Sequence, residues 1–192
     1  MLKLMAITSS ILFITLILVG CTQQNNNNYE LTFIAESDSM YPAIKSGDTL
    51  IYEKIQNKDE ITTWKEANDS GNYKKFSDYG DVIIYYPYGD NNSDEIAHRA
   101  MCWINVEYNG PNKTYSIDKY GLNQINADEP LFIPEIGIMN SNNQPIMVNW
   151  ENSGFITKGD NPTTNYVCDQ VGGVCDNPIK VEWILGKVTG LK

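Results

Sequence analysis

Histidine and arginine are almost absent from this sequence of 192 residues, which contains one of each, the neighbours His98 and Arg99. Basic side chains are few in general: 14 lysines and arginines stand against 24 aspartates and glutamates, and the formal net charge is −10. A chain with this charge offers no basic face to a phosphate backbone, so we predict no nucleic-acid partner. A mechanism that needs a histidine as general base can use only His98.

Cysteine is also scarce, with four residues in the chain. Two cysteines without a nearby histidine or further cysteine do not make a zinc site, so we predict no metal and no other cofactor. Cys168 and Cys175 bracket a segment containing two glycines, which predicts a disulfide between them outside the cytoplasm. We expect Cys102 to be a buried thiol, since a cysteine protease built on it would need a second histidine.

Long apolar runs are limited to one stretch, residues 4–20, so we expect any membrane attachment to come from the N-terminus. The stretch is near the short limit for spanning a bilayer. It is followed by Cys21 in the sequence Leu-Val-Gly-Cys, which resembles a lipobox, so Cys21 is a lipidation candidate. Lipidated Cys21 and an uncleaved anchor helix remain alternatives. Both predict that residues 29–192 lie on the extracytoplasmic side, tethered to the membrane.

Periodicity and turn residues predict a mainly β protein. We expect a signal or anchor segment at residues 1–21, a polar linker at 22–28 and one domain at 29–192. The expected strands are 29–35, 49–55, 82–86, 97–106, 114–117, 155–158 and 179–189. Residues 122–128 are weakly helix-like, and 60–75 and 133–148 are predicted as loops. The predicted fold is a single antiparallel, twisted sheet with a barrel-like shape.

One segment carries chemistry of its own: Ser37-Asp38-Ser39-Met40-Tyr41-Pro42. A serine hydroxyl attacks a carbonyl at neutral pH only when a neighbouring base takes its proton. His98 lies between strand-like runs and is the one histidine that could act as this base. The pair predicts a serine hydrolase.

Five motifs in order resemble those of a type I signal peptidase, in the branch of archaea and the endoplasmic reticulum that uses histidine where bacteria use lysine. The first is the serine segment above, and the second consists of two Gly-Asp turns before strands. The others are the histidine box, a Gly-Asp-Asn box and a closing strand. Their positions in this chain are 37–42, 47–48 with 80–83, 96–100, 155–162 and 185–188.

The resemblance implies roles for individual residues. Ser39 would be the nucleophile, His98 the general base, and Asp160 the carboxylate that orients His98. The Ser37 hydroxyl and the Ser39 backbone N–H would bind the oxyanion. Asp169 is a second acidic candidate, because the family often has another aspartate after the Gly-Asp-Asn box. Between the two aspartates, we predict Asp160, which lies inside the recognisable box.

Asp38 departs from the family pattern, which usually has glycine at that position, and could disfavour negative charge beside the nucleophile. The resemblance implies a membrane-tethered serine endopeptidase that removes signal peptides from exported precursor proteins after small residues. The alternative is a non-catalytic or narrowly specialised surface lipoprotein that binds peptides with the same fold. Asp38, the displaced second aspartate and the lack of a long anchor favour this alternative.

Overall fold

The computed structural model describes residues 30–192. The predictions for Cys21, for the apolar segment and for the linker fall outside the described residues. From residue 30 onward, no helix combines the length and the apolar character needed to cross a membrane.

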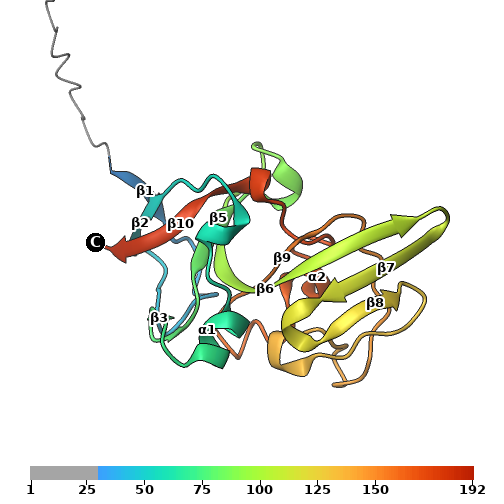
Figure 1. Ribbon diagram of the computed structural model, residues 1–192. Helices are drawn as coiled ribbons and strands as arrows, with labels where there is room; N and C mark the ends of the chain where they lie inside the picture. Colours follow the sequence, from blue (N-terminus) through green and yellow to red (C-terminus); the bar gives the residue numbers. More distant parts are fainter. Residues whose placement is uncertain (1–29) are drawn as a thin grey trace, which may run out of the picture.

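An eight-stranded antiparallel sheet forms the body of the protein, in the order β1-β2-β10-β5-β6-β7-β8, with β9 paired to β6 (Figure 1). Its strands are β1 Leu31–Ile34, β2 Thr49–Glu53, β5 Val82–Tyr85, β6 Ile96–Asn109, β7 Asn112–Ile117, β8 Leu122–Asn126, β9 Gly154–Lys158 and β10 Ile184–Leu191. A separate two-stranded sheet pairs β3 (Lys74–Lys75) with β4 (Asp78–Tyr79).

The mainly β, antiparallel prediction is confirmed, but the barrel-like shape is not. In residues 30–192 the sheet begins at β1 and ends at β8 without closing, because these two strands do not pair with each other. The prediction of a single sheet is also incomplete, since β3 and β4 form a second sheet in which they pair only with each other.

Strand β6 is the longest in the sheet, with 14 residues, and it joins the two parts of the fold. Its beginning pairs with β5, its middle with β9 and its end with β7. Successive residues of a strand point to opposite faces. The neighbours His98 and Arg99 therefore leave β6 in opposite directions.

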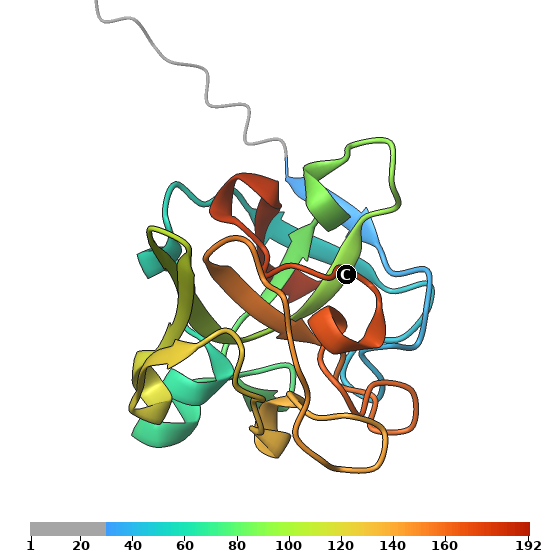
Figure 2. The same cartoon turned by 90° about the vertical axis from the view of Figure 1, so that its right-hand side faces the viewer.

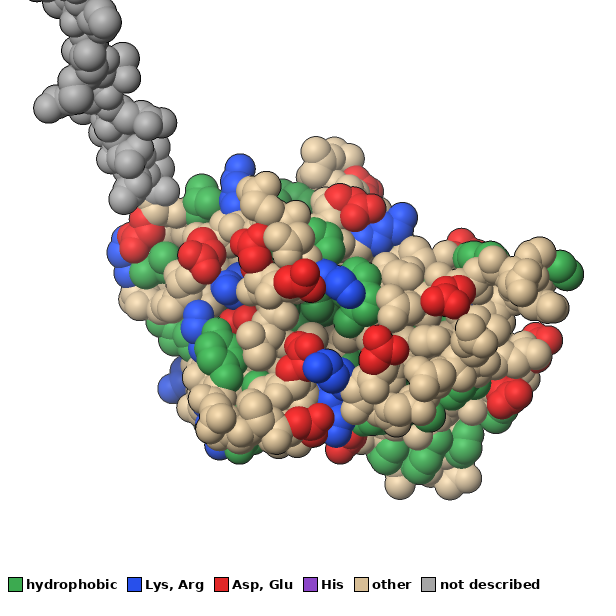
Figure 3. All heavy atoms as spheres, viewed as in Figure 1, with side chains coloured by type: hydrophobic (Ala, Val, Ile, Leu, Met, Phe, Trp, Pro, Cys, Tyr) green, Lys and Arg blue, Asp and Glu red, His purple; other side chains and the backbone are tan. Residues whose placement is uncertain are grey.

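Three apolar clusters fill the interior. The one that supports the candidate site contains buried residues from the β1–β2 region, β5 and β10, with Ala97 of β6 packed against it. A second lies between β6, β7 and the segment before β9, and includes Tyr115 and Trp150. The third lies on β5, β6 and β9. Figure 3 shows acidic and basic side chains interspersed on one face of the surface rather than separated.

All seven predicted strands are present, six of them with ends that differ by a few residues. The first part of the seventh, 179–189, is wrong: Val181–Trp183 form a short 3-10 helix, and β10 begins at Ile184. The helix-like interpretation of 122–128 is wrong: β8 occupies this segment and pairs with β7, which buries Leu122 and Ile125 partly against the second cluster. The predicted loop at 60–75 contains α1 (Trp64–Ser70). Thr63 and Glu66 form a capping box at its start, a sequence signature that our prediction missed.

The Gly80-Asp81 turn fixes α1 against the sheet. A Cβ atom on Gly80 would lie 2.5 Å from the Trp64 nitrogen, and Gly80 has φ +76, so no other residue fits without distortion. Asp81 is buried and accepts hydrogen bonds from the Thr62 N–H at 2.8 Å and the Tyr73 hydroxyl at 2.7 Å. This turn holds the start of β5 in place, as its position before a predicted strand indicated.

Candidate active site

Ser39 lies in a turn that follows β1. The base of the turn is closed by the Ala35 N–H, which donates to Asp48 O at 2.9 Å, and by the Gly47 N–H, which donates to Ala35 O at 2.7 Å. Met40 is buried beneath the turn, in the apolar cluster shared with β5 and β10. The turn is thus fixed on both sides of Ser39.

Ser39, His98 and Asp169 form a continuous chain of hydrogen bonds. Ser39 Oγ lies 2.9 Å from His98 Nε2, and His98 Nδ1 lies 2.8 and 2.9 Å from the two carboxylate oxygens of Asp169. An ionised carboxylate only accepts hydrogen bonds, so Nδ1 carries the hydrogen and Nε2 is free to accept the Ser39 proton. The arrangement has the order nucleophile, base and orienting acid.

The prediction that Asp160 orients His98 is wrong. Asp160 pairs with Arg99, with Arg99 Nε 2.8 Å and Nη2 2.5 Å from its two carboxylate oxygens. Arg99 is fully buried and also donates to the Tyr79 and Gly80 carbonyl oxygens. Because Arg99 and His98 point to opposite faces of β6, the aspartate inside the motif lies on the face away from the base. The second candidate, Asp169, takes the orienting position.

Asp169 is the first residue of the short helix α2 (Asp169–Gly172), which packs against β9 (Figures 1 and 2). Its burial works against ionisation, but the charge of His98 and hydrogen bonds from His98 and Tyr85 hold its pKa below the usual range. Asp169 is therefore a carboxylate at neutral pH, although only 2% of its surface is exposed.

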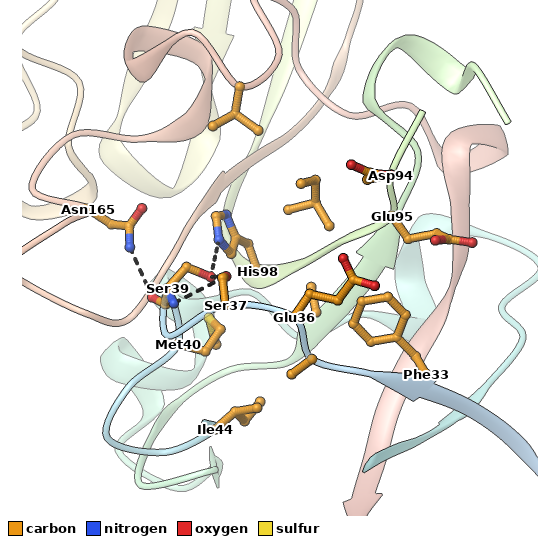
Figure 4. Close-up of a pocket in the computed structure, with 14 residues that line it drawn as sticks. Phe33, Glu36, Ser37, Ser39, Met40, Ile44, Asp94, Glu95, His98 and Asn165 are labelled. Atoms are coloured by element: carbon orange, nitrogen blue, oxygen red, sulfur yellow. Dashed lines mark hydrogen bonds between the residues drawn. The ribbon is translucent and has the colours of Figure 1, made fainter. Parts of the chain in front are cut away.

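The Gly-Asp-Asn box holds the backbone of Ser39. Ser39 O accepts hydrogen bonds from the Asn161 N–H at 2.9 Å and from Asn165 Nδ2 at 3.0 Å. A Cβ on Gly159 would lie 2.6 Å from the same oxygen, so glycine is required for this close approach. Figure 4 shows Asn165 and His98 on either side of Ser39. The sequence indicated no role for Asn165, since a loop asparagine three residues beyond the motif carries no signal of its own.

Ser37 lies beside Ser39, as the motif predicted. Its hydroxyl donates to Ser39 Oγ at 3.2 Å, and the Ser39 N–H points to Ser37 Oγ at 3.4 Å. The Asp38 carboxylate accepts from the Ser46 N–H at 2.9 Å, and within residues 30–192 no hydrogen bond joins it to Ser39 or His98. Asp38 thus belongs to the turn rather than to the hydrogen-bonded site.

The predicted disulfide between Cys168 and Cys175 is not formed: both are free thiols. Cys168 packs into the cluster with Tyr115 and Trp150, whereas Cys175 packs into the cluster on β5 and β9, so α2 directs the two sulfurs to different parts of the core. Cys102 is a buried thiol, as predicted. Burial, followed by the charge of Asp169, raises the pKa of Cys168 to about 12.

A groove of about 330 Å³ opens at Ser39 and His98 (Figure 4). One wall comes from residues 33–39 and the other from residues 94–98, although β2, β10 and β5 lie between β1 and β6 in the sheet. The sheet must therefore curl strongly to bring these walls together. Apolar side chains of the groove are Phe33, Ala35, Met40, Ile44, Ile96, Ala97 and Val174. Glu36, Asp94 and Glu95 also line it.

Within the described part of the chain, no group of three or more histidine, cysteine, aspartate or glutamate side chains is arranged to hold a metal ion. The chain matches no protein-family model, and no curated protein matches it. The interpretation of the site consequently depends on its geometry and on the sequence motifs.

Proposed function

We propose that this protein is a serine endopeptidase of the type I signal peptidase kind, with Ser39 as nucleophile, His98 as general base and Asp169 as the orienting carboxylate. The observation that carries the proposal is the hydrogen-bond chain from Ser39 Oγ through His98 to Asp169, at 2.9 and 2.8 Å. The order of the five motifs supports the choice of family.

In the proposed reaction, Ser39 Oγ attacks the carbonyl carbon of a peptide bond while His98 Nε2 takes the hydroxyl proton. The new C–O bond forms and the C–N bond breaks, and the proton passes from His98 to the departing amine. Water then attacks the acyl-enzyme, His98 accepts its proton, and Ser39 leaves with that proton restored. Asp169 stabilises the imidazolium that forms in each half of the cycle.

The negative oxygen of the tetrahedral intermediate would be bound by the Ser39 N–H and the Ser37 hydroxyl, whose nitrogen and oxygen atoms lie 3.4 Å apart. Once Ser39 Oγ is bonded to the substrate carbon, the Ser37 hydroxyl can turn from Ser39 Oγ toward the oxyanion. Removing one such donor typically costs about 2.7–4 kcal/mol of transition-state stabilisation. Ser37 therefore contributes to the rate without being the nucleophile.

The groove supports an extended peptide as substrate, because it is walled by two backbone segments with apolar side chains between them. The family resemblance supports small residues one and three positions before the cut, in precursors with a signal peptide. Membrane tethering through residues 1–28 stays a prediction, as does the extracytoplasmic location.

The test uses the full-length protein in detergent with a precursor that carries an Ala-x-Ala site. We expect a single cut by the wild type, none by Ser39→Ala, and a reduced but measurable rate for Ser37→Ala. Ser141→Ala, in an exposed loop, is the matched control and should cleave at the wild-type rate. Cleavage by Ser39→Ala at the wild-type rate would sink the proposal.

The same assay addresses the alternative of a non-catalytic peptide-binding lipoprotein. That alternative predicts peptide binding by wild type without any cleavage product. Two sequence features no longer favour this alternative. Asp38 bonds to Ser46 within its turn, and the displaced second aspartate, Asp169, contacts His98.

A further inference from the structure

A buried chain of hydrogen bonds continues beyond Asp169, away from the groove. The Tyr85 hydroxyl donates to Asp169 Oδ2 at 2.8 Å, and Thr157 Oγ1 lies 3.2 Å from the Tyr85 oxygen. Gln170 Nε2 in turn donates to Thr157 Oγ1 at 3.2 Å. Tyr85 and Thr157 are fully buried, and Gln170 is 6% exposed, so water does not compete for these groups.

The direction of this chain is fixed by one backbone group. The Thr157 N–H donates to Gln170 Oε1 at 3.0 Å, which identifies the other atom of the amide as the NH₂ group. Gln170 Nε2 can only donate, so Thr157 Oγ1 accepts from it and gives its own proton to the Tyr85 oxygen. Tyr85 then has one proton left, and it points to Asp169. Every donor in the chain is therefore directed toward the carboxylate.

Tyr85 is suited to hold this proton at all relevant pH values. Its burial and then the charge of Asp169 raise the pKa of the phenol well above its ordinary value. A hydroxyl that stays protonated is a permanent donor to Asp169 Oδ2. It restricts rotation of the carboxylate. It also stabilises the negative charge of Asp169, which would otherwise be stabilised by His98 alone.

We propose that Tyr85 is a positioning residue for the Ser39–His98–Asp169 site, acting through Asp169 to set the orientation of His98 and the pH at which it takes up a proton. This inference rests on the proposed function for its consequence on rate. Its effect on His98 itself can be measured without a substrate.

For the comparison to isolate Tyr85, the variant must leave the other ionisable side chains near His98 as they are in the wild type. On the groove side these are Glu36, Asp94 and Glu95. The buried thiols of Cys168 and Cys175 also lie near Asp169, and burial raises their pKa values. Tyr85→Phe changes none of them and keeps the aromatic ring in the core, so it isolates the hydroxyl.

The single histidine makes the measurement direct. In the full-length, tag-free chain in detergent, labelled at histidine with ¹³C and ¹⁵N, every imidazole NMR signal belongs to His98. We would follow this signal from pH 4 to pH 9 in the wild type, in Tyr85→Phe and in Tyr115→Phe. Tyr115 is the matched control, because it is also fully buried but its hydroxyl bonds to backbone atoms of Val148 and Trp150.

Without the Tyr85 hydroxyl, the Asp169 carboxylate interacts more strongly with protonated His98. His98 therefore keeps its proton to a higher pH. We expect the titration midpoint to rise by about one pH unit in Tyr85→Phe, because the hydrogen bond that is lost goes to a charged group. The kcat/KM for the precursor at pH 7 should fall roughly tenfold, mainly through kcat. Tyr115→Phe should match the wild-type midpoint.

A Tyr85→Phe midpoint equal to that of the wild type overturns the proposal, whatever the cleavage result. If Tyr85→Phe fails to fold, Thr157→Val decides, because it removes the donor to Tyr85 and should shift the midpoint in the same direction by a smaller amount. Loss of the proposed function has a different signature: the wild type would cleave nothing, while the His98 titration would still differ between wild type and Tyr85→Phe.

Discussion

His98 and Arg99 are neighbours on β6, and each pairs with one aspartate of the segment that follows β9, yet the two pairs do different things. In the His98–Asp169 pair, the aspartate is buried and the histidine lines the groove, where it contacts a serine hydroxyl. The Arg99–Asp160 pair lies on the other face of the strand, and its arginine bonds to the carbonyls of the Gly80 turn. One strand thus separates the pair for which we propose a chemical role from a pair that holds a turn, and the same kind of substitution should have opposite consequences in each.

The largest effect should come from Asp169→Asn. An asparagine can hold His98 in the wrong tautomer and cannot stabilise the imidazolium, so we expect kcat for precursor cleavage to fall about 10⁴-fold. The matched control is Asp176→Asn, an exposed aspartate in the same segment. Single-turnover cleavage at pH 7 measures both. An Asp169→Asn enzyme within tenfold of wild type would remove Asp169 from the site.

The reverse pattern is expected for Asp160→Asn. Arg99 is fully buried, so the loss of its counter-ion should lower the free energy of unfolding by about 3–5 kcal/mol. Activity per folded molecule should be much closer to that of the wild type than in Asp169→Asn. Urea unfolding followed by tryptophan fluorescence, with cleavage assayed on the folded fraction, gives both quantities. A stable but inactive Asp160→Asn would reverse the roles of the two aspartates.

A smaller effect should come from Asn165→Ala. This variant removes one of two donors to Ser39 O, while the Asn161 N–H remains. A neutral hydrogen bond is worth about 0.5–1.5 kcal/mol, which corresponds to a loss of roughly 2- to 12-fold in kcat/KM. Asn142→Ala, in an exposed turn, is the control. If Asn165→Ala and Asn142→Ala cleave at the same rate, the hydrogen bond from Asn165 to Ser39 O does not contribute to kcat/KM.

The smallest effect concerns stability in acid. The pKa of Asp169 is lowered in the folded state, so its contribution to stability is present above the unfolded-state value of about 3.9 and is lost as the pH falls through the folded value. Between pH 6 and pH 3, the free energy of unfolding should therefore fall less in Asp169→Asn than in the wild type. Urea unfolding at both pH values measures this difference. An equal fall in the two proteins would contradict the pKa shift.

The sequence predicted the strands and the serine–histidine pair because both depend on local signals. Alternating apolar residues mark the strands, and a chain with one histidine leaves one choice of base. The choice between Asp160 and Asp169 depended on which face of β6 each reaches, and the motif carries no information about that. The disulfide prediction failed for a similar reason, since α2 sends Cys168 and Cys175 into different clusters.

Tyr85 was not predicted as part of the site, although a weak signal existed. It ends a strand in which all four residues are buried, and a buried tyrosine hydroxyl needs a partner. The sequence could indicate that such a partner exists but not that it is Asp169, which is 84 residues away. Contacts of this range are set by the curl of the sheet and by the packing of α2 on β9.

The central claim is that His98 must be neutral to accept the proton of Ser39, and a pH–rate profile tests it most directly. Precursor cleavage by the full-length wild type should lose rate as the pH falls through the range in which imidazoles titrate, about pH 5 to 8. His98→Ala should show no cleavage at any pH, and His98→Lys should not restore it, because a carboxylate neighbour keeps an ammonium charged. Full activity in His98→Ala, or a wild-type profile without an acid limb in this range, would contradict the account.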